Sequence, residues 1–304
     1  MPKKSKKQNT RLEIYPLKKG RYNLIDASDL EIVSLGFPSP PQTILLHEMW
    51  RKIYASDFHL IPPEFTHRKR KKKAFHSSRK KITDDKDMYT WCGSLLNDGS
   101  NYKSITSSWI IPDIQVPVAG EGNNFFCSIW VGIGGLNGTN LIQAGIDHDI
   151  TVNLNGSTPS VYFWYEWTPD VQKRDLDFKV AVGDSVSFIV EVVSETQFMV
   201  HFANHTQKYT ITPFTLTATG GQTLNVQSAE WVVERPKFNG VNTQLPVFKN
   251  IVFTQMSALT DTSLEIQGGT GNLISMIDDV TNNDIATATQ LSASEINVNY
   301  KGPQ

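Results

Sequence analysis

From residue 88 to the C-terminus, short apolar runs alternate with turn signals such as Asn97-Asp98-Gly99 and Asn155-Gly156. The runs are rich in Val, Ile, Phe, Tyr and Trp, as is typical of β-strands. We therefore expect strands at Ser107–Ile111, Phe125–Ile133, Val161–Trp167, Ser185–Val193, Phe198–Phe202, Ala229–Glu234, Val247–Phe253 and Ile296–Tyr300. Many short strands separated by regular turns favour an all-β fold, a two-sheet antiparallel β-sandwich.

The period of two along a strand predicts which side chains share a face. Three apolar strands place polar groups on one face, where burial without a partner would be costly. Such faces are the solvent side of a sandwich or, because large aromatic side chains accompany a glutamate, a binding groove. The three sets are Tyr162, Trp164 and Glu166, then Glu230, Val232 and Glu234, and finally Leu141, Gln143 and Gly145.

Residues 1–86 differ in composition and lack the strand pattern. We predict that they form a basic, irregular N-terminal extension before a β-sandwich domain at 87–304. Proline punctuates this leader, and basic runs occur at Lys3–Lys7 and His67–Lys81. One apolar stretch, Thr43–Ile53, is compatible with a helix. Segments of this composition bury too little apolar surface to fold firmly alone.

Charge divides at the same boundary. Residues 1–86 hold 20 Lys and Arg against 9 Asp and Glu, so the rest of the chain holds 9 of its 29 basic and 21 of its 30 acidic groups. A domain with few basic groups has little self-repulsion when its carboxylates are protonated, which predicts tolerance of acid. The run at His67–Lys81 is a solvated linker, a segment that docks on the acidic domain, or a polyanion-binding patch. Because only Phe65 and Phe75 accompany it, nucleic-acid binding is not expected.

Several functional classes lack their sequence signals. There is no Gly-x-Ser-x-Gly elbow, HExxH motif or phosphate-binding loop. His148, His201 and His205 share no metal-binding spacing, so we expect neither a metal nor another cofactor. Cys92 and Cys127 lie in apolar strands and are expected to be buried thiols or one disulfide. No apolar stretch is long enough for a transmembrane helix or an ordinary signal peptide.

A series of motifs in the body resembles the glutamic peptidase family, also called eqolisins. The resemblance covers nearly all of 88–300 and rests on the order and spacing of the motifs. Details such as GIGG are closer to the bacterial branch of the family. The motifs are TWCGSLL (Thr90–Leu96), WIIP (Trp109–Pro112), IWVGIGG (Ile129–Gly135), LIQAGID (Leu141–Asp147), FWYEWTP (Phe163–Pro169), VGDSVSF (Val182–Phe188), SAEWVVERP (Ser228–Pro236), FKNIVFT (Phe248–Thr254) and the terminal Ile274–Tyr300.

The resemblance implies a concanavalin A-like sandwich whose concave sheet binds substrate. It also implies that Gln143 and Glu234 are the catalytic pair. Trp130, Trp164 and Glu166 match substrate-binding residues of the family, and Tyr162 occupies a further substrate-binding position. Fungal members carry aspartate in place of Gly134 and of Tyr162, so the carboxylates around the pair differ here.

These two residue types suit peptide hydrolysis. A glutamate can take a proton from water and return it to the leaving amine, and a glutamine can orient the water and stabilise the oxyanion. We therefore expect an acid-acting endopeptidase. The alternative is a non-catalytic concanavalin A-like protein that binds carbohydrate or peptide through Trp130 and Trp164.

The expected partner is a polypeptide substrate, with no membrane, and the chain is expected to be a monomer. The resemblance implies a secreted protein or an acidic compartment, although no signal peptide is visible. Opposite charges predict that the leader docks on the body as an inhibitory prosegment, with removal between Lys81 and Thr90. Glycosylation sequons occur at Asn137, Asn155 and Asn204.

Overall fold

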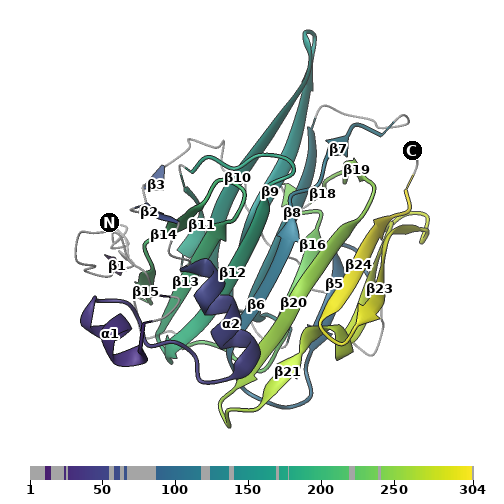
Figure 1. The fold of residues 1–304 in the computed structure, drawn as a ribbon. Helices are drawn as coiled ribbons and strands as arrows, with labels where there is room; N and C mark the ends of the chain where they lie inside the picture. Colours follow the sequence, from purple (N-terminus) through teal and green to yellow (C-terminus); the bar gives the residue numbers. More distant parts are fainter. Residues whose placement is uncertain are drawn as a thin grey trace, which may run out of the picture.

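The computed structural model of this chain describes residues 11–14, 24, 27–54, 58–61, 65–66, 87–117, 124–136, 140–168, 171–176, 178–218, 223–238 and 241–302. Within them, two large and mostly antiparallel sheets face each other, and a smaller sheet joins them along one side (Figure 1). The expectation of an all-β sandwich is confirmed. The basic runs at Lys3–Lys7 and His67–Lys81 lie outside the described residues.

Sheet A carries the leader on its outer face. Its strand order follows from the pairings and begins with β1 of the leader. The strands are β1 (Arg11–Ile14), β15 (Phe214–Thr217), β13 (Gln197–Asn204), β12 (Ser185–Ser194), β6 (Tyr102–Ile110), β20 (Ile251–Thr260) and β21 (Glu265–Gln267). A short extension continues from β13 through β14 (Tyr209–Ile211) to β2 (His59–Ile61), which is parallel to β14.

Sheet B has the longest strands, and its outer face carries the residues that the resemblance singles out. In spatial order its strands are β22 (Asn272–Ile277), β5 (Trp91–Leu96), β16 (Ala229–Glu234), β8 (Asn124–Gly134), β9 (Leu141–Asn153), β10 (Gly156–Thr168), β11 (Val171–Leu176) and β3 (Phe65–Thr66). The tip of the β9–β10 hairpin extends beyond the sandwich (Figure 1).

Sheet C connects the two large sheets, because its outermost long strands also belong to them. It runs from β20 through β24 (Glu295–Tyr300) and β23 (Asp284–Ser292) to β22 and β4 (Asp87–Met88). The remaining elements are the strand pairs β7 (Ile114–Gln115) with β19 (Val247–Phe248) and β17 (Lys237–Phe238) with β18 (Val241–Asn242), and the 3-10 turn η1 (Gly268–Thr270).

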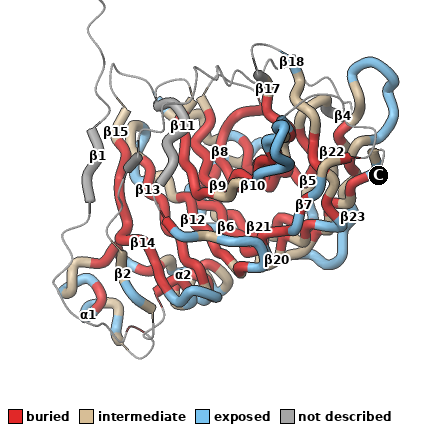
Figure 2. Tube along the Cα trace, turned by 90° about the horizontal axis from the view of Figure 1, so that it is seen from above, coloured by how far each residue is buried: buried red, intermediate tan, exposed pale blue. Residues whose placement is uncertain are grey.

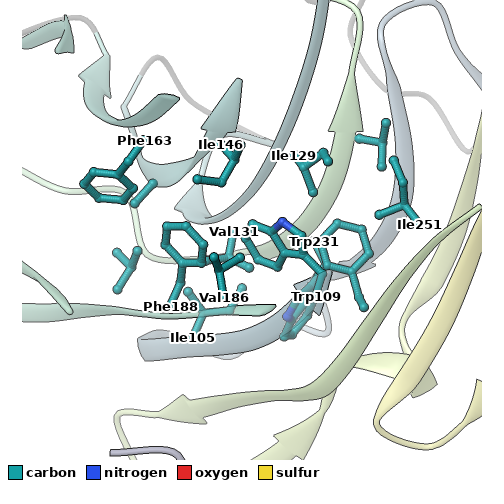
Figure 3. Close-up of a cluster of buried hydrophobic side chains, with 14 of the residues drawn as sticks. Ile105, Trp109, Ile129, Val131, Ile146, Phe163, Val186, Phe188, Trp231 and Ile251 are labelled. Carbon is teal, nitrogen blue, oxygen red and sulfur yellow. The ribbon is translucent and has the colours of Figure 1, made fainter. Parts of the chain in front are cut away.

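The core lies between sheets A and B and is made of every second side chain of each strand. Figure 3 shows aromatic and branched side chains meeting there from both sheets. Trp109 stacks on Phe188 with ring centroids 4.5 Å apart, and the Trp231 indole donates to the Thr106 carbonyl at 2.9 Å. Cys92 and Cys127 are buried free thiols, the first of the two predicted states, and burial raises the pKa of Cys92 to about 12.

The strand predictions differ from the structure mainly at their ends and at one break. The predicted run Val247–Phe253 is divided into β19 and β20, because Lys249 and Asn250 turn outward and are exposed between them. The predicted strand Ser107–Ile111 begins earlier, at Tyr102, since Ser and Thr alternate with core residues along β6. Neither change alters which side chains share a face.

The helix expected at Thr43–Ile53 is present as α2 (Ile44–Ile53), preceded by α1 (Asp29–Ser34). Helix α2 lies on the outer face of sheet A, and one stripe of it is buried (Figures 1 and 2). Neither helix, nor any other in the described residues, has the length and apolar character needed to cross a membrane.

Candidate active site

The outer face of sheet B presents its side chains in three rows that cross β16, β8, β9 and β10. The rows follow from the pairing register, because directly opposite residues of neighbouring strands point to the same face. The first is Glu230, Gly132, Gln143 and Glu166; the aromatic row is Val232, Trp130, Gly145 and Trp164; the third is Glu234, Ser128, Asp147 and Tyr162. All of the sequence-predicted site residues therefore lie on one face.

Glycine at position 145 allows the middle row to close. A Cβ atom there would lie 2.6 Å from the Cβ of Trp130 and 2.1 Å from the Ile129 carbonyl oxygen. Any side chain would therefore push the Trp130 strand away. Trp130 and Trp164 are 0% and 1% exposed, and they belong to a cluster that includes Trp91 and Ile274. The aromatic row is packed rather than solvated, contrary to the idea of a solvent face.

Glu234, at the end of β16, is held by an indole. The Nε1 atom of Trp130 donates to Glu234 Oε2 at 2.9 Å. Trp91, which pairs with Glu234 in the register, meets the Trp130 ring edge to face with centroids 5.0 Å apart. Glu234 itself is half-buried. The carboxylate is thus oriented by a neutral donor while part of the side chain remains accessible.

Gln143 is oriented by the carboxylate directly opposite on β10. Its Nε2 atom donates to Glu166 Oε2 at 3.1 Å, and both side chains are nearly buried. Because a carboxylate only accepts, this contact fixes which end of the amide faces β10. The Oε1 atom of Gln143 is buried and accepts no hydrogen bond within the described part of the chain. An acceptor and one remaining amide hydrogen are therefore available for a ligand.

Tyr162 is buried and bonds to two carboxyl groups. Its side chain is 2% exposed, and its hydroxyl lies 2.5 Å from Asp147 Oδ2 and 2.9 Å from Asp149 Oδ2. Ser128 also donates a short hydrogen bond to Asp147. Ser128, Asp147 and Tyr162 of the third row therefore form, together with Asp149, a hydrogen-bonded network of two carboxyl groups and two hydroxyls.

Sequence reasoning placed Glu230 on such a face without giving it a role, and it did not select Asp147 or Asp149. Asp147 and Asp149 follow Gln143 at steps of two in LIQAGIDHD, so the period of two could have found them. Glu230 is fully buried and accepts from Ser228 Oγ at 2.6 Å. Because Ser228 also binds the backbone of the turn after β8 through Leu136 N and Gly134 N, Glu230 stabilises that turn.

His148, His201 and His205 lie off this face. His148 is fully buried, and burial lowers its pKa to about 4, whereas His201 is on sheet A and His205 directly follows strand β13. Within the described residues, no group of three His, Cys, Asp or Glu side chains is arranged to hold a metal ion. The sequon residue Asn204 is fully buried and donates to Asp184, so it is not accessible for glycosylation, whereas Asn155 is exposed.

Comparisons with known proteins identify the family and the fold. The model of the peptidase A4 family matches residues 89–300. A crystal structure of scytalido-glutamic peptidase with a peptide-based transition-state analogue is similar, with a TM-score of 0.58 and 22% identity over 70% of this chain and 98% of that one. No curated protein matches the sequence significantly.

Two further structures have the same fold. SCP-B, described as a member of the eqolisin family in complex with the tripeptide Ala-Ile-His, has a TM-score of 0.55 and 20% identity over 70% of this chain and 98% of that one. Aspergilloglutamic peptidase from Aspergillus niger has a TM-score of 0.50 and 23% identity over 58% of this chain and 99% of that one.

Proposed function

This chain belongs to the peptidase A4 family and is a glutamic endopeptidase, and we propose that Gln143 and Glu234 activate the water that attacks the peptide bond. The observation that carries the assignment is the pair of restraints on this face. Glu234 is oriented by the Trp130 indole yet half-buried, and the Gln143 amide is fixed by Glu166 with its carbonyl oxygen unpartnered among the described residues.

In the proposed reaction no side chain of the protein forms a covalent bond to the substrate. Glu234 takes one proton from water while the water oxygen bonds to the carbonyl carbon of the substrate. The amide hydrogen of Gln143 that Glu166 does not engage stabilises the oxyanion, and its carbonyl oxygen orients the water. When the C–N bond breaks, Glu234 returns the proton to the leaving nitrogen. One peptide bond and one water become a carboxylic acid and an amine.

Glu166 and Tyr162 are positioning residues in this proposal. Glu166 holds the amide of Gln143, and Tyr162 holds Asp147, which lies in the row of Glu234, and Asp149. Trp130 positions Glu234, and Trp164 contributes the packed wall of the aromatic row. Substrate contacts of Trp130 and Trp164 beyond these roles remain a prediction from the family resemblance.

The substrate is a polypeptide, and we place the activity at acidic pH. An ordinary glutamate titrates near pH 4.3, so a glutamate base suits a reaction in mildly acidic solution. The small number of basic groups in 87–304 is compatible with such conditions. We further propose that the protein is secreted or lies in an acidic compartment. It acts there as a monomer, without nucleic acid or metal.

The decisive test is a digest of denatured casein between about pH 2 and about pH 7. Glu234→Gln should lower kcat/KM by at least about 100-fold, the usual effect of losing a general base. Glu230→Gln is the comparison variant, because Glu230 is a carboxyl group of the same strand that lies in the row of Gln143, whereas Glu234 lies two rows away. This comparison variant should keep most of the activity per folded molecule.

Folding is checked for both variants by circular dichroism and thermal unfolding. If folded Glu234→Gln protein keeps wild-type activity, or if Glu230→Gln causes the larger loss, the assignment of the base is wrong. A chain that binds casein without cleaving it at any pH would favour the non-catalytic binding protein.

A further inference from the structure

The outer face of sheet A is covered by part of the leader, although the leader was expected to be held by charge. Helix α2 buries Leu46, Met49, Trp50 and Ile53, and Tyr54 follows as its C-cap. These positions are three or four residues apart, so they form a single stripe along the helix. The opposite side carries Ile44, which is 76% exposed.

Sheet A offers a matching surface to this stripe. The outward positions of its central strands are small or polar beneath the helix, among them Ser108, Ser187 and Ala203. Ile189 and Ala203 pack in one cluster with Met49, Trp50 and Ile53, and Ser108 Oγ lies 3.7 Å from the sulfur of Met49. Small side chains there leave room for the large side chains of the helix.

Polar contacts fix the position of the helix at both ends. At its N-terminus the backbone N–H groups of Leu45 and Leu46 donate to the Glu265 carboxylate, while Thr43 forms no side-chain cap. At its C-terminus the hydroxyl of Tyr54 lies 2.6 Å from Nδ1 of His201, and both groups are buried. These contacts join residues more than a hundred positions apart in the sequence.

The covering extends beyond the helix. Leu24, Ile32 and Phe37 are each no more than 2% exposed and belong to the same cluster as Trp50. After the helix, β2 pairs with β14, which adds backbone hydrogen bonds to sheet A. The segment is therefore held mainly by buried apolar side chains and by backbone pairing, and these interactions are not screened by salt.

We propose that residues 24–61 are a permanent part of the folded enzyme, and that they remain bound to the outer face of sheet A as a separate chain after the polypeptide is cut between 67 and 86. The surface that binds them recognises an amphipathic helix with an aromatic and aliphatic stripe. A cut in the basic run at His67–Lys81 would thus produce a two-chain protein rather than release of the leader.

The test uses the full-length Glu234→Gln protein, so that self-digestion does not interfere. Limited trypsin treatment cuts within the basic run, intact-mass measurement identifies the two fragments, and gel filtration at neutral pH separates bound from released material. The N-terminal fragment should co-elute with the body in equal amounts, in low salt and in about 1 M NaCl, and should leave only in denaturant.

Two variants on helix α2 form a matched pair. Trp50→Ala should release the fragment after the cut, because it removes the largest side chain of the buried stripe, whereas Ile44→Ala should not. If Trp50→Ala does not fold, Tyr54→Phe provides the second measurement and should lower the denaturant concentration that releases the fragment.

Release of the fragment in low salt from the protein with an unchanged helix α2 would overturn the proposal. Co-elution in low salt with loss in about 1 M NaCl would also overturn it, and would show that opposite charges hold the leader. Because neither readout is an activity, these outcomes are independent of the proposed catalytic pair.

Discussion

The outer faces of sheets A and B carry polar side chains at alternate positions of long strands, but the chemistry of those side chains differs. On sheet A they are mostly hydroxyls and imidazoles, which both donate and accept. Thr106 donates to the Phe188 carbonyl, and Ser187 bonds to both Ser108 and His205. Such groups can satisfy one another, and a helix of the same chain then covers them.

On sheet B the polar side chains are mostly carboxyl groups, which accept when ionised and cannot satisfy one another. Each has a neutral donor nearby: Trp130 for Glu234, Gln143 for Glu166, Tyr162 for Asp149 and Ser228 for Glu230. An acidic face built this way keeps groups that can exchange protons. If the proposed site is right, sheet A serves stability and sheet B serves chemistry, and three changes test this difference.

The largest expected effect is on Gln143. Gln143→Ala should lower kcat/KM by about 100-fold or more, as for other lost oxyanion donors, with the fold retained. The matched control is Gln197→Ala on sheet A, where the amide of Gln197 donates to Thr217 on the next strand. Steady-state peptide hydrolysis should be unchanged in the control. Equal losses in both variants would mean that the two faces do not differ in function.

A smaller effect is expected at Tyr162. Tyr162→Phe removes a buried hydroxyl between two carboxyl groups and should destabilise the fold by about 1–3 kcal/mol. It should also change the pH profile of kcat/KM, because Asp147, in the row of Glu234, loses a hydrogen bond.

Tyr209→Phe on sheet A is the comparison for this change, since the Tyr209 hydroxyl donates to the Lys179 carbonyl. Its loss of stability in thermal unfolding should be similar, and its pH profile should match the wild type. An unaltered profile in Tyr162→Phe would remove Tyr162 from the catalytic network.

The smallest effect concerns acid and the covered face. Burial and the nearby Lys52 lower the pKa of His205, whose Nε2 atom bonds to Ser187 and whose ring meets Phe58. At pH values above the ordinary histidine pKa near 6.5, His205 is neutral in both the folded and the unfolded chain. It then contributes nothing to the pH dependence of the free energy of unfolding. As the pH falls from there towards the lowered folded value, only the unfolded chain is protonated, and the free energy of unfolding decreases.

His205→Asn removes this proton uptake. At about pH 5 the Tm of the variant should exceed that of the wild type by about 1 °C, and at neutral pH the variant should show no gain. Thermal unfolding at the two pH values measures it. A gain that is equal at both would show that packing, not titration, is responsible.

The sequence by itself determined the class of fold, the faces of the strands and one helix. Alternation of apolar and polar residues predicted that Trp164 and Glu166 would share one face of their strand, since successive side chains of a strand point in opposite directions. The family resemblance implied that Gln143 and Glu234 lie on the same face. The apolar stretch Thr43–Ile53 was compatible with a helix, and α2 lies there. The alternation and the apolar stretch are local properties, and the structure has both.

Only the tertiary structure decided which of these faces is covered and which groups meet. The pairing register placed Asp147 and Tyr162 in the row of Glu234, and packing of the aromatic row buried Trp164. Charge counts suggested an electrostatic contact for the leader, but the surface that receives α2 is formed by strands far apart in the sequence. Their small outward residues form a surface for the helix only after the strands are paired, so no local pattern could reveal it.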